Sequence, residues 1–399
     1  MPGPAESIFW IALCAVLAPL IAALVLRGKV PEVVLLLVLG VLIGPHVLEL
    51  AVTTEGVDML RELGLGMLFM LAGYELEPAE LAGRGGRRAL VAWVGCIALA
   101  LVLVFALHQA DQVKGEIAVA IALTSTSLGT LLPILKDSGL LGSAVGKSVM
   151  NHGAYGEFGP IIAMAVLLGA RGPVESIVVL VGFGLLAVLL NVLSARLSRE
   201  GSSILDVVRR GAETSGQTQV RLVVLLLVTL TFAAAAFELD VVLGAFAAGF
   251  VLRQLVPEGH ESLEHKLAGL AFGLLIPVFF VTSGMAINPR AVVEEPVALV
   301  SFVALILVVR GGVVFVASIT DGDFNARESA AIASFAAAGL PIIVAVTTVA
   351  VRGGEMTELN ASVLVTGGAI TVLICPLLGH RLVGGGHPDR VSPSSPVGP

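Results

Sequence analysis

The sequence has 399 residues, of which 57% are hydrophobic and 13% are charged, and its formal net charge is −7. The charged fraction lies far below the roughly 25% of soluble domains, and together with a mean hydropathy of +1.00 it excludes an ordinary soluble protein and indicates a polytopic membrane protein. The net charge gives no indication of nucleic-acid binding, and the three cysteines, in separate apolar runs, predict neither a disulfide framework nor a zinc site.

Apolar runs recur along the chain at lengths near those that cross a bilayer. A spanning helix needs roughly 20 apolar residues, and about thirteen such runs are present. The first has no basic region before it, so we expect it to remain as a helix rather than act as a signal peptide. The runs are centred near Leu17, Leu39, Leu68, Ala98, Thr126, Glu157, Leu185, Val228, Ala247, Leu275, Val308, Leu340 and Ala369.

The polar interruptions predict a division into two halves. Residues 1–193 form a first repeat of six helices plus a linker helix, and residues 222–383 form a second repeat of six helices. Residues 194–221 form a polar connector that is too short for a domain, and residues 384–399 have the composition of a disordered tail. We therefore expect no soluble regulatory domain within this chain.

The distribution of lysine and arginine predicts the orientation of the chain in the membrane. Successive loops alternate between an arginine- and lysine-rich set and a set that is poor in both, and cytoplasmic loops carry the excess. This places the amino terminus outside, and the 194–221 connector and the carboxyl terminus in the cytoplasm, as for a multi-pass protein of the plasma membrane.

Two segments repeat across the halves without gaps. Residues 68–78, "LFMLAGYELEP", align with residues 279–289, "FFVTSGMAINP", which pairs Gly73 with Gly284. Two spans later, each half has an interrupted span, "ALTSTSLGTLLP" or "SFAAAGLP". The second member of each pair comes seven spans after the first, so the halves run in opposite directions through the membrane. Inverted repeats with matched broken helices are typical of secondary transporters, whose substrates bind near the midplane.

The two interruptions supply candidate cation-binding positions. A broken helix exposes carbonyl ends that can hold a cation and amide ends that need a negative group. The hydroxyl groups fit equally well a role in capping their own helix backbone. The candidate positions are Thr124, Ser125, Thr126, Ser127, Gly129, Ala338, Gly339 and Pro341.

Charged residues inside spans are the strongest functional candidates, because burial of a charge in a bilayer is costly. Glu157 has the deepest placement, and we expect it to bind the cation and the proton; a permanent ion pair is its structural alternative. Arg310 stays protonated, so it is a candidate for compensating charge rather than carrying the proton. His152, Lys147 and Asn151 are secondary candidates, and His152, five residues before Glu157 on a different helix face, fits packing better than a proton relay.

Four motifs resemble those of the monovalent cation:proton antiporter-2 family, which includes Kef-type proteins and sodium/proton exchangers. They are "VVLLLVLGVLIGPHVLEL", "ELGLGMLFMLAGYELEPAEL", "DVVLGAFAAGFVL" and "LIPVFFVTSGMAIN", in the family's order. The resemblance implies an all-α sodium/proton antiporter-like fold of thirteen helices. It also implies a homodimer, in which a core that contains the broken helices slides against a dimer scaffold.

Two departures from the family and one further match accompany the resemblance. The family usually has Asp at the position of Glu157, preceded by Asp, Asn or Gln, whereas this chain has Gly156 there. Arg310 matches a basic position that is Arg in many electroneutral members. The nucleotide-binding domain of full Kef proteins does not follow, so we expect no regulation by it.

The sequence therefore predicts a protein of the lipid bilayer that exchanges Na⁺ or K⁺ for H⁺. We expect no nucleic-acid partner, no cofactor and no metal beyond the transported cation. A cation channel or a proton/solute symporter of the same fold is the alternative. An intramembrane enzyme is disfavoured, because no deep span carries Asp and no histidines pair as a metal site would require.

Overall fold

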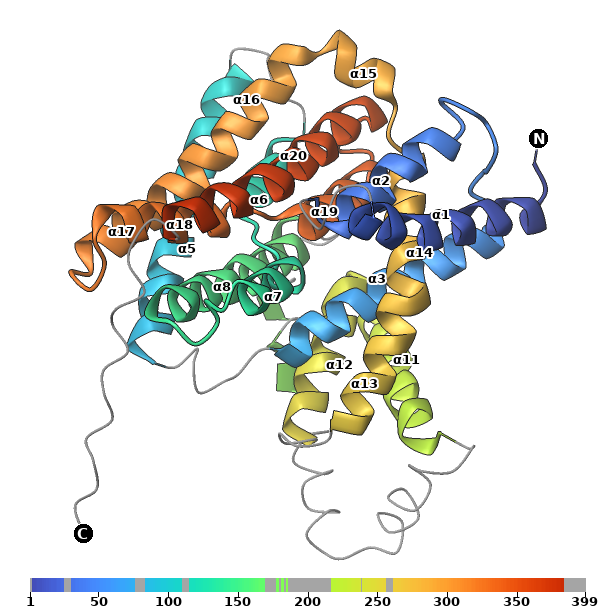
Figure 1. Cartoon of the computed structure of the whole chain (residues 1–399), viewed down its shortest axis with the longest axis horizontal. Helices are drawn as coiled ribbons and strands as arrows, with labels where there is room; N and C mark the ends of the chain where they lie inside the picture. The colour runs from blue at the N-terminus through green and yellow to red at the C-terminus, as the bar shows by residue number, and fades with distance from the viewer. Residues whose placement is uncertain are drawn as a thin grey trace, which may run out of the picture.

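The computed structural model describes residues 2–24, 30–75, 83–109, 115–168, 177–178, 181–182, 184–185, 217–237, 239–255 and 261–383. All regular structure in these ranges is helical (Figure 1). Seven helices in them are long and apolar enough to cross a membrane, and three shorter apolar helices accompany them. The predicted connector lies outside the described residues except for 217–221, as do the tail and nearly all of the span around Leu185.

In chain order the helices of the first half are α1 (Pro4–Leu24), α2 (Glu32–Ile43), α3 (Glu55–Glu75), α5 (Arg84–Gln109), α6 (Glu116–Leu123), α7 (Leu128–Asp137) and α8 (Ala144–Leu167). In this half, α1 and α5 are long and apolar enough to cross a membrane, and α6 and α7 are the two parts of a broken span.

The second half contains two π-helical turns, η1 (Ala271–Leu275) and η2 (Leu307–Gly312), each continuous with the α-helices around it. Turns of this kind are rare and often mark functional positions. The α-helices are α11 (Thr218–Ala236), α12 (Val241–Leu255), α13 (Glu261–Leu270), α14 (Ile276–Met285), α15 (Pro289–Glu294), α16 (Pro296–Ile306), α17 (Val313–Thr320), α18 (Ala326–Ala336), α19 (Leu340–Arg352) and α20 (Glu358–Val383).

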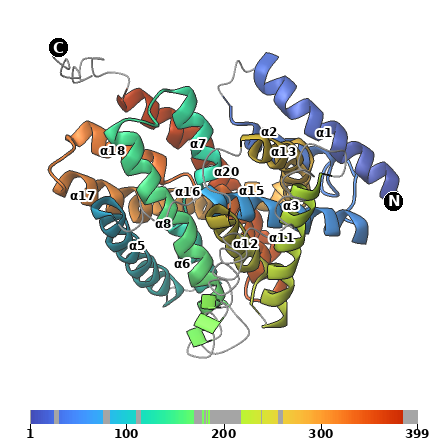
Figure 2. The same ribbon diagram turned by 90° about the horizontal axis from the view of Figure 1, so that it is seen from below.

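The helices pack in two groups that lie side by side in Figures 1 and 2. One group, here called the scaffold, contains α1, α2, α3, α11, α12, α13 and α14, and within it α3 packs against α12 and α2 against α14. The other group, here called the core, contains α5 to α8 and α16 to α20. The broken helices lie in the core group, as the resemblance implied.

Gly73 and Gly284, paired by the internal repeat, make equivalent contacts in the two halves. A Cβ atom at Gly73 would meet the backbone carbonyl of Phe246 on α12, and one at Gly284 would meet the backbone carbonyl of Leu37 on α2. Each glycine thus lets two spanning helices approach to backbone contact, the means by which membrane helices associate without a hydrophobic driving force. The repeat found in the sequence is therefore a repeat in helix packing.

Candidate functional site

The two interrupted spans are broken helices that cross within the core. α6 ends at Leu123 and α7 begins at Leu128, while α18 ends at Ala336 and α19 begins at Leu340. One backbone hydrogen bond joins the two breaks directly, in which Ser127 N donates to Ala338 O at 2.8 Å. Pro341 lies in the first turn of α19 and has no backbone N–H. This loses no hydrogen bond of the helix, because N–H groups in the first turn have no intrahelical partner.

The hydroxyl run has two roles at the crossing. Thr124 Oγ1 donates to Ile121 O at 2.8 Å and Ser125 Oγ to Ala122 O at 2.7 Å, so both cap the carboxyl end of α6. Ser125 Oγ also lies 3.3 Å from Gly339 O, and Thr126 Oγ1 donates to Ala336 O across the crossing. Thr124 therefore acts as a backbone cap. Ser125 and Thr126, in contrast, connect one helix break to the other. Gly129, in the first turn of α7, has open space where a Cβ would be.

Glu157 lies on α8 beside this crossing, with 3% of its surface exposed. Its Oε2 accepts a hydrogen bond from Leu128 N at 3.2 Å. Leu128 is the first residue of α7, where backbone N–H groups lack intrahelical partners and carry partial positive charge. The carboxylate is thus the negative group that we expected at an amide end of a broken helix.

Gly156, the residue before Glu157, leaves room for a guanidinium group. A Cβ at this position would collide with Nη2 of Arg310 and with Oγ1 of Thr126. The space in which the family usually places a polar side chain is therefore filled here by Arg310. This explains in steric terms why a glycine stands at this departure from the family pattern.

Arg310 lies in η2 and is completely buried. Its Nε donates to Thr126 Oγ1 at 2.9 Å, its Nη2 donates to the backbone carbonyl of His152 at 2.5 Å, and its Nη1 lies 3.8 Å from Cys96 Sγ. Within the described residues, no ion pair joins Arg310 to Glu157. Charge compensation by Arg310 stays a prediction, and its contacts add a positioning role for the crossing.

The three secondary candidates lie together, away from the helix crossing. His152, Lys147 and Asn151 line one cavity of about 240 Å³ between α5, α8 and the end of α17. His152 is 5% exposed, and its Nδ1 has no hydrogen-bond partner among the described residues. Lys147 is exposed. Their placement gives them no contact with the Glu157 carboxylate.

The sodium/hydrogen exchanger transmembrane family model matches residues 12–383, which include both helix breaks, Glu157 and Arg310. The chain belongs to the sodium/hydrogen exchanger family. The predicted resemblance to cation/proton antiporters is therefore confirmed, and the protein is a multi-pass membrane protein of a transporter family.

Two curated relatives show the breadth of this exchanger family. KefC of Klebsiella pneumoniae (strain 342), a glutathione-regulated potassium-efflux system protein, is 29% identical over 300 residues, which are 72% of this chain and 47% of KefC. YjbQ of Bacillus subtilis (strain 168), named as an Na⁺/H⁺ antiporter, is 24% identical over 297 residues, which are 70% of this chain and 47% of YjbQ. The chain thus spans about half the length of these relatives.

The fold is that of a solved antiporter. The structure of the sodium proton antiporter MjNhaP1 from Methanocaldococcus jannaschii at pH 8 superposes with a TM-score of 0.63 at 14% sequence identity, covering 95% of this chain and 97% of that one. The expected all-helical antiporter-like fold is confirmed.

A second carboxylate lies at the end of a scaffold helix. Glu75 is the last residue of α3. Its Oε2 is buried and has no hydrogen-bond partner among the described residues. In the internal repeat Glu75 aligns with Ala286, so an ionisable residue stands at this position in one half only. This asymmetry is the feature of the sequence that distinguishes Glu75.

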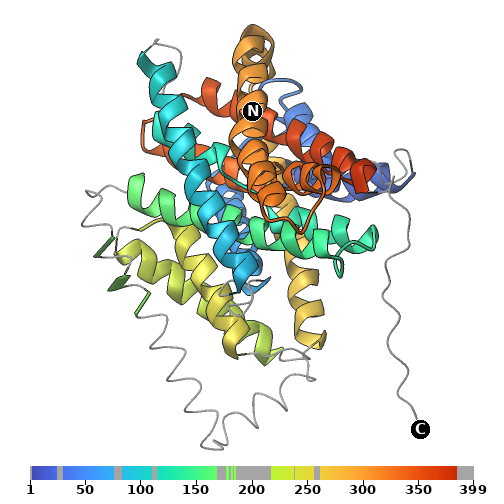
Figure 3. The ribbon, with the colours of Figure 1, turned by 90° about the vertical axis from the view of Figure 1, so that its left-hand side faces the viewer.

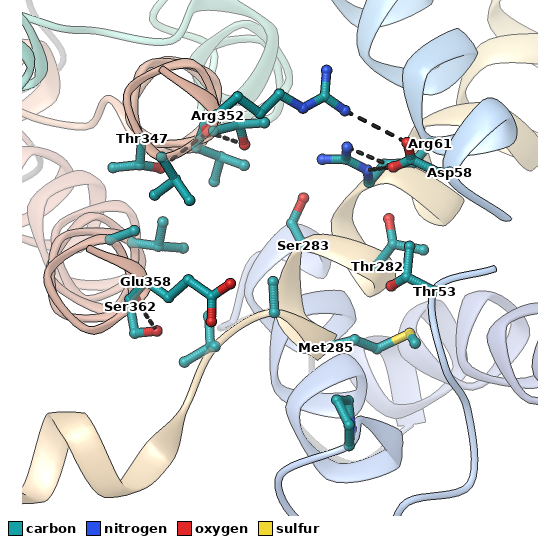
Figure 4. Close-up of a pocket in the computed structure, with 18 of the residues that line it drawn as sticks. Thr53, Asp58, Arg61, Thr282, Ser283, Met285, Thr347, Arg352, Glu358 and Ser362 are labelled. Atoms are coloured by element: carbon teal, nitrogen blue, oxygen red, sulfur yellow. Dashed lines mark hydrogen bonds and ion pairs between the residues drawn. The ribbon is translucent and has the colours of Figure 1, made fainter. Parts of the chain in front are cut away.

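Core and scaffold of the exchanger also meet at a pocket of about 420 Å³ lined by α3, α14, α19 and α20 (Figure 4). Nη2 of Arg352, at the end of core helix α19, lies 2.9 Å from Glu62 Oε1 and 3.6 Å from Asp58 Oδ2, both on scaffold helix α3. Arg61 also pairs with Asp58, at 2.6 Å. The two ion pairs of Arg352 cross the boundary between core and scaffold.

Proposed function

We propose that this exchanger-family protein exchanges Na⁺ or K⁺ for H⁺ across the plasma membrane. The observation that carries the proposal is Glu157, a buried carboxylate on an amide end of two crossing broken helices. The ionised carboxylate and the nearby carbonyl ends bind the cation, and a proton on Glu157 displaces it. Cation and proton therefore compete, and apparent cation affinity weakens as pH falls.

Movement of the core against the scaffold would expose this site to each side in turn. In support, the broken helices, Glu157 and Arg310 all belong to the core, while the scaffold packs separately through backbone contacts at glycines. In such an elevator motion the ion pairs of Arg352 with Glu62 and Asp58 break and re-form. A homodimer held by the scaffold would keep that half fixed in the bilayer.

The deciding experiment measures cation-induced proton movement in vesicles that contain the purified protein. Addition of Na⁺ or K⁺ to one side should drive protons in the opposite direction, and a scan over alkali ions ranks the preferred cation. Cation flux without counter-directed proton flux would favour a channel, and co-directed flux would favour a symporter.

We expect exchange to be electroneutral. One carboxylate that holds either one monovalent cation or one proton moves no net charge. A membrane potential imposed with a potassium ionophore should therefore leave the rate of sodium-driven proton movement almost unchanged. A strong dependence on voltage would reveal a second proton carrier, and Glu75, His152 and Lys147 are then the residues to substitute.

The proposed topology places the amino terminus outside and the 194–221 connector and carboxyl terminus in the cytoplasm. Cysteines introduced at Ser202 and at Thr357, in a background in which Cys14, Cys96 and Cys375 are replaced, should react from opposite sides of an oriented membrane. Reaction of both from the same side would contradict the inverted orientation of the two halves.

A further inference from the structure

An apolar groove runs along the outer face of the core, between α5 and the helix formed by η2 and α17. These elements pack side by side (Figure 3, in blue-green and orange). The groove has a volume of about 810 Å³, and its sides are formed chiefly by Val91, Leu99, Val308, Val313 and Val316. Val91, Val308 and Val316 are well exposed on a face that the bilayer surrounds. The groove therefore has the shape and chemistry to hold an acyl chain.

One end of the groove opens beside a polar cavity. Arg88, Ala317 and Asp321 line both the groove and the cavity of about 240 Å³ that contains His152, so the two hollows adjoin at these residues. Four basic side chains, Arg84, Arg87, Arg88 and Lys147, line the combined site, against the two acids Asp321 and Asp323.

The charge balance at this end favours an anion. Arg88 is paired with Asp321 and lies 3.8 Å from Asp323. Within the described part of the chain, Arg84, Arg87 and Lys147 form no ion pair. Arg84 and Lys147 line the cavity and Arg87 lines the groove, and arginine at such a position matches phosphate geometry.

The cavity also contains buried polar atoms that lack a protein partner. Ser318, on α17, is 3% exposed, and its Oγ makes no hydrogen bond to a described residue. The same holds for Nδ1 of His152 on the facing helix α8. Buried polar groups are nearly always paired, so two unpaired ones that line one cavity point to a polar group that enters it.

We propose that this site binds one membrane phospholipid with an anionic headgroup. The acyl chain lies in the valine-lined groove, and the phosphate lies at the cavity mouth, near Arg84 and Arg87. Ser318 Oγ and His152 Nδ1 then hydrogen-bond to the headgroup or to water held under it. With the proposed topology this lipid belongs to the cytoplasmic leaflet.

Occupancy of the site bears on the exchanger centre through one residue. The backbone carbonyl of His152 accepts a hydrogen bond from Arg310, and Arg310 also holds Thr126 at the helix crossing. A lipid that ties α5, α8 and α17 together at His152 and Ser318 steadies the helix segments around that arginine.

The proposal is tested on the full-length protein, purified and stripped of lipid in detergent. Native mass spectrometry then counts retained phosphatidylglycerol and phosphatidylcholine with identical acyl chains, and thermal unfolding measures stabilisation by each. Wild-type protein should retain phosphatidylglycerol in preference. Arg84→Gln/Arg87→Gln should lose that preference, whereas the control pair Arg327→Gln/Arg381→Gln, exposed basic residues away from the groove, should keep it.

Two further substitutions separate the acyl groove from the headgroup cavity. Gly312 lines the groove with ordinary space around a Cβ, so Gly312→Leu should fill it and reduce retention of both lipids, while Gly273→Leu, in the other π-helical turn, should not. Ser318→Ala should leave the unfolding temperature without lipid unchanged and reduce the rise that phosphatidylglycerol gives. Wild-type preference for phosphatidylglycerol in Arg84→Gln/Arg87→Gln together with wild-type lipid retention in Gly312→Leu would overturn the proposal, as would equal stabilisation by inorganic phosphate alone.

Discussion

Glu157→Gln should abolish cation-driven proton movement in a protein that is at least as stable as the wild type. Glutamine has the same shape, and its oxygen can still accept the hydrogen bond that Leu128 N donates to Glu157. The substitution also removes a buried charge, which is costly inside a membrane. Vesicle transport and thermal unfolding of the same preparation measure both effects.

Two control variants sharpen this result. Glu157→Asp restores the acid that the family usually carries and should retain part of the activity. Glu294→Gln removes an exposed carboxylate outside the site and should leave exchange unchanged. Exchange at the wild-type rate in Glu157→Gln would show that the carboxylate is structural, and a lowered unfolding temperature would show that its charge stabilises the fold.

The broken helices and the inverted repeat could be predicted because their signals are local. Gly and Pro cluster with small or hydroxyl residues at both breaks, where they lower the cost of interrupting a helix. The sequence alone aligns Gly73 with Gly284, and in the structure each glycine lets its helix contact the backbone of a neighbouring helix. The depth of Glu157 followed in the same way from the length of the apolar run around it.

The partners of the charged groups could not be predicted, because they depend on which helix faces which. Position in the sequence placed Arg310 at the right depth but could not show that it points toward Thr126 and His152. The Oε2 atom of Glu75, at the end of α3, is buried without a hydrogen-bond partner among the described residues, which its position in the sequence did not indicate. Side-chain direction is set by tertiary packing, which no period or motif encodes.

Arg310→Ala should destabilise the protein strongly and lower the rate of exchange. It removes the donor to Thr126 Oγ1 and to the carbonyl of His152, and each buried acceptor left without a donor costs about 1–3 kcal/mol. Arg310→Lys keeps the charge, but its single ammonium cannot span Thr126, His152 and Cys96, so its stability should fall between those of Arg310→Ala and the wild type. Thermal unfolding of the three proteins ranks them.

A double-mutant cycle with Glu157→Gln separates the two roles of Arg310. If Arg310 positions the crossing through its hydrogen bonds, the stability changes of Arg310→Ala and Glu157→Gln should add to within about 0.5 kcal/mol. Near-additivity is the expected result, because the hydrogen bonds of Arg310 go to Thr126 and His152. If Arg310 mainly compensates the charge of Glu157, the second substitution should instead restore much of the stability lost in the first, since it removes the uncompensated buried carboxylate. Arg310→Ala protein that unfolds at the wild-type temperature would contradict both roles.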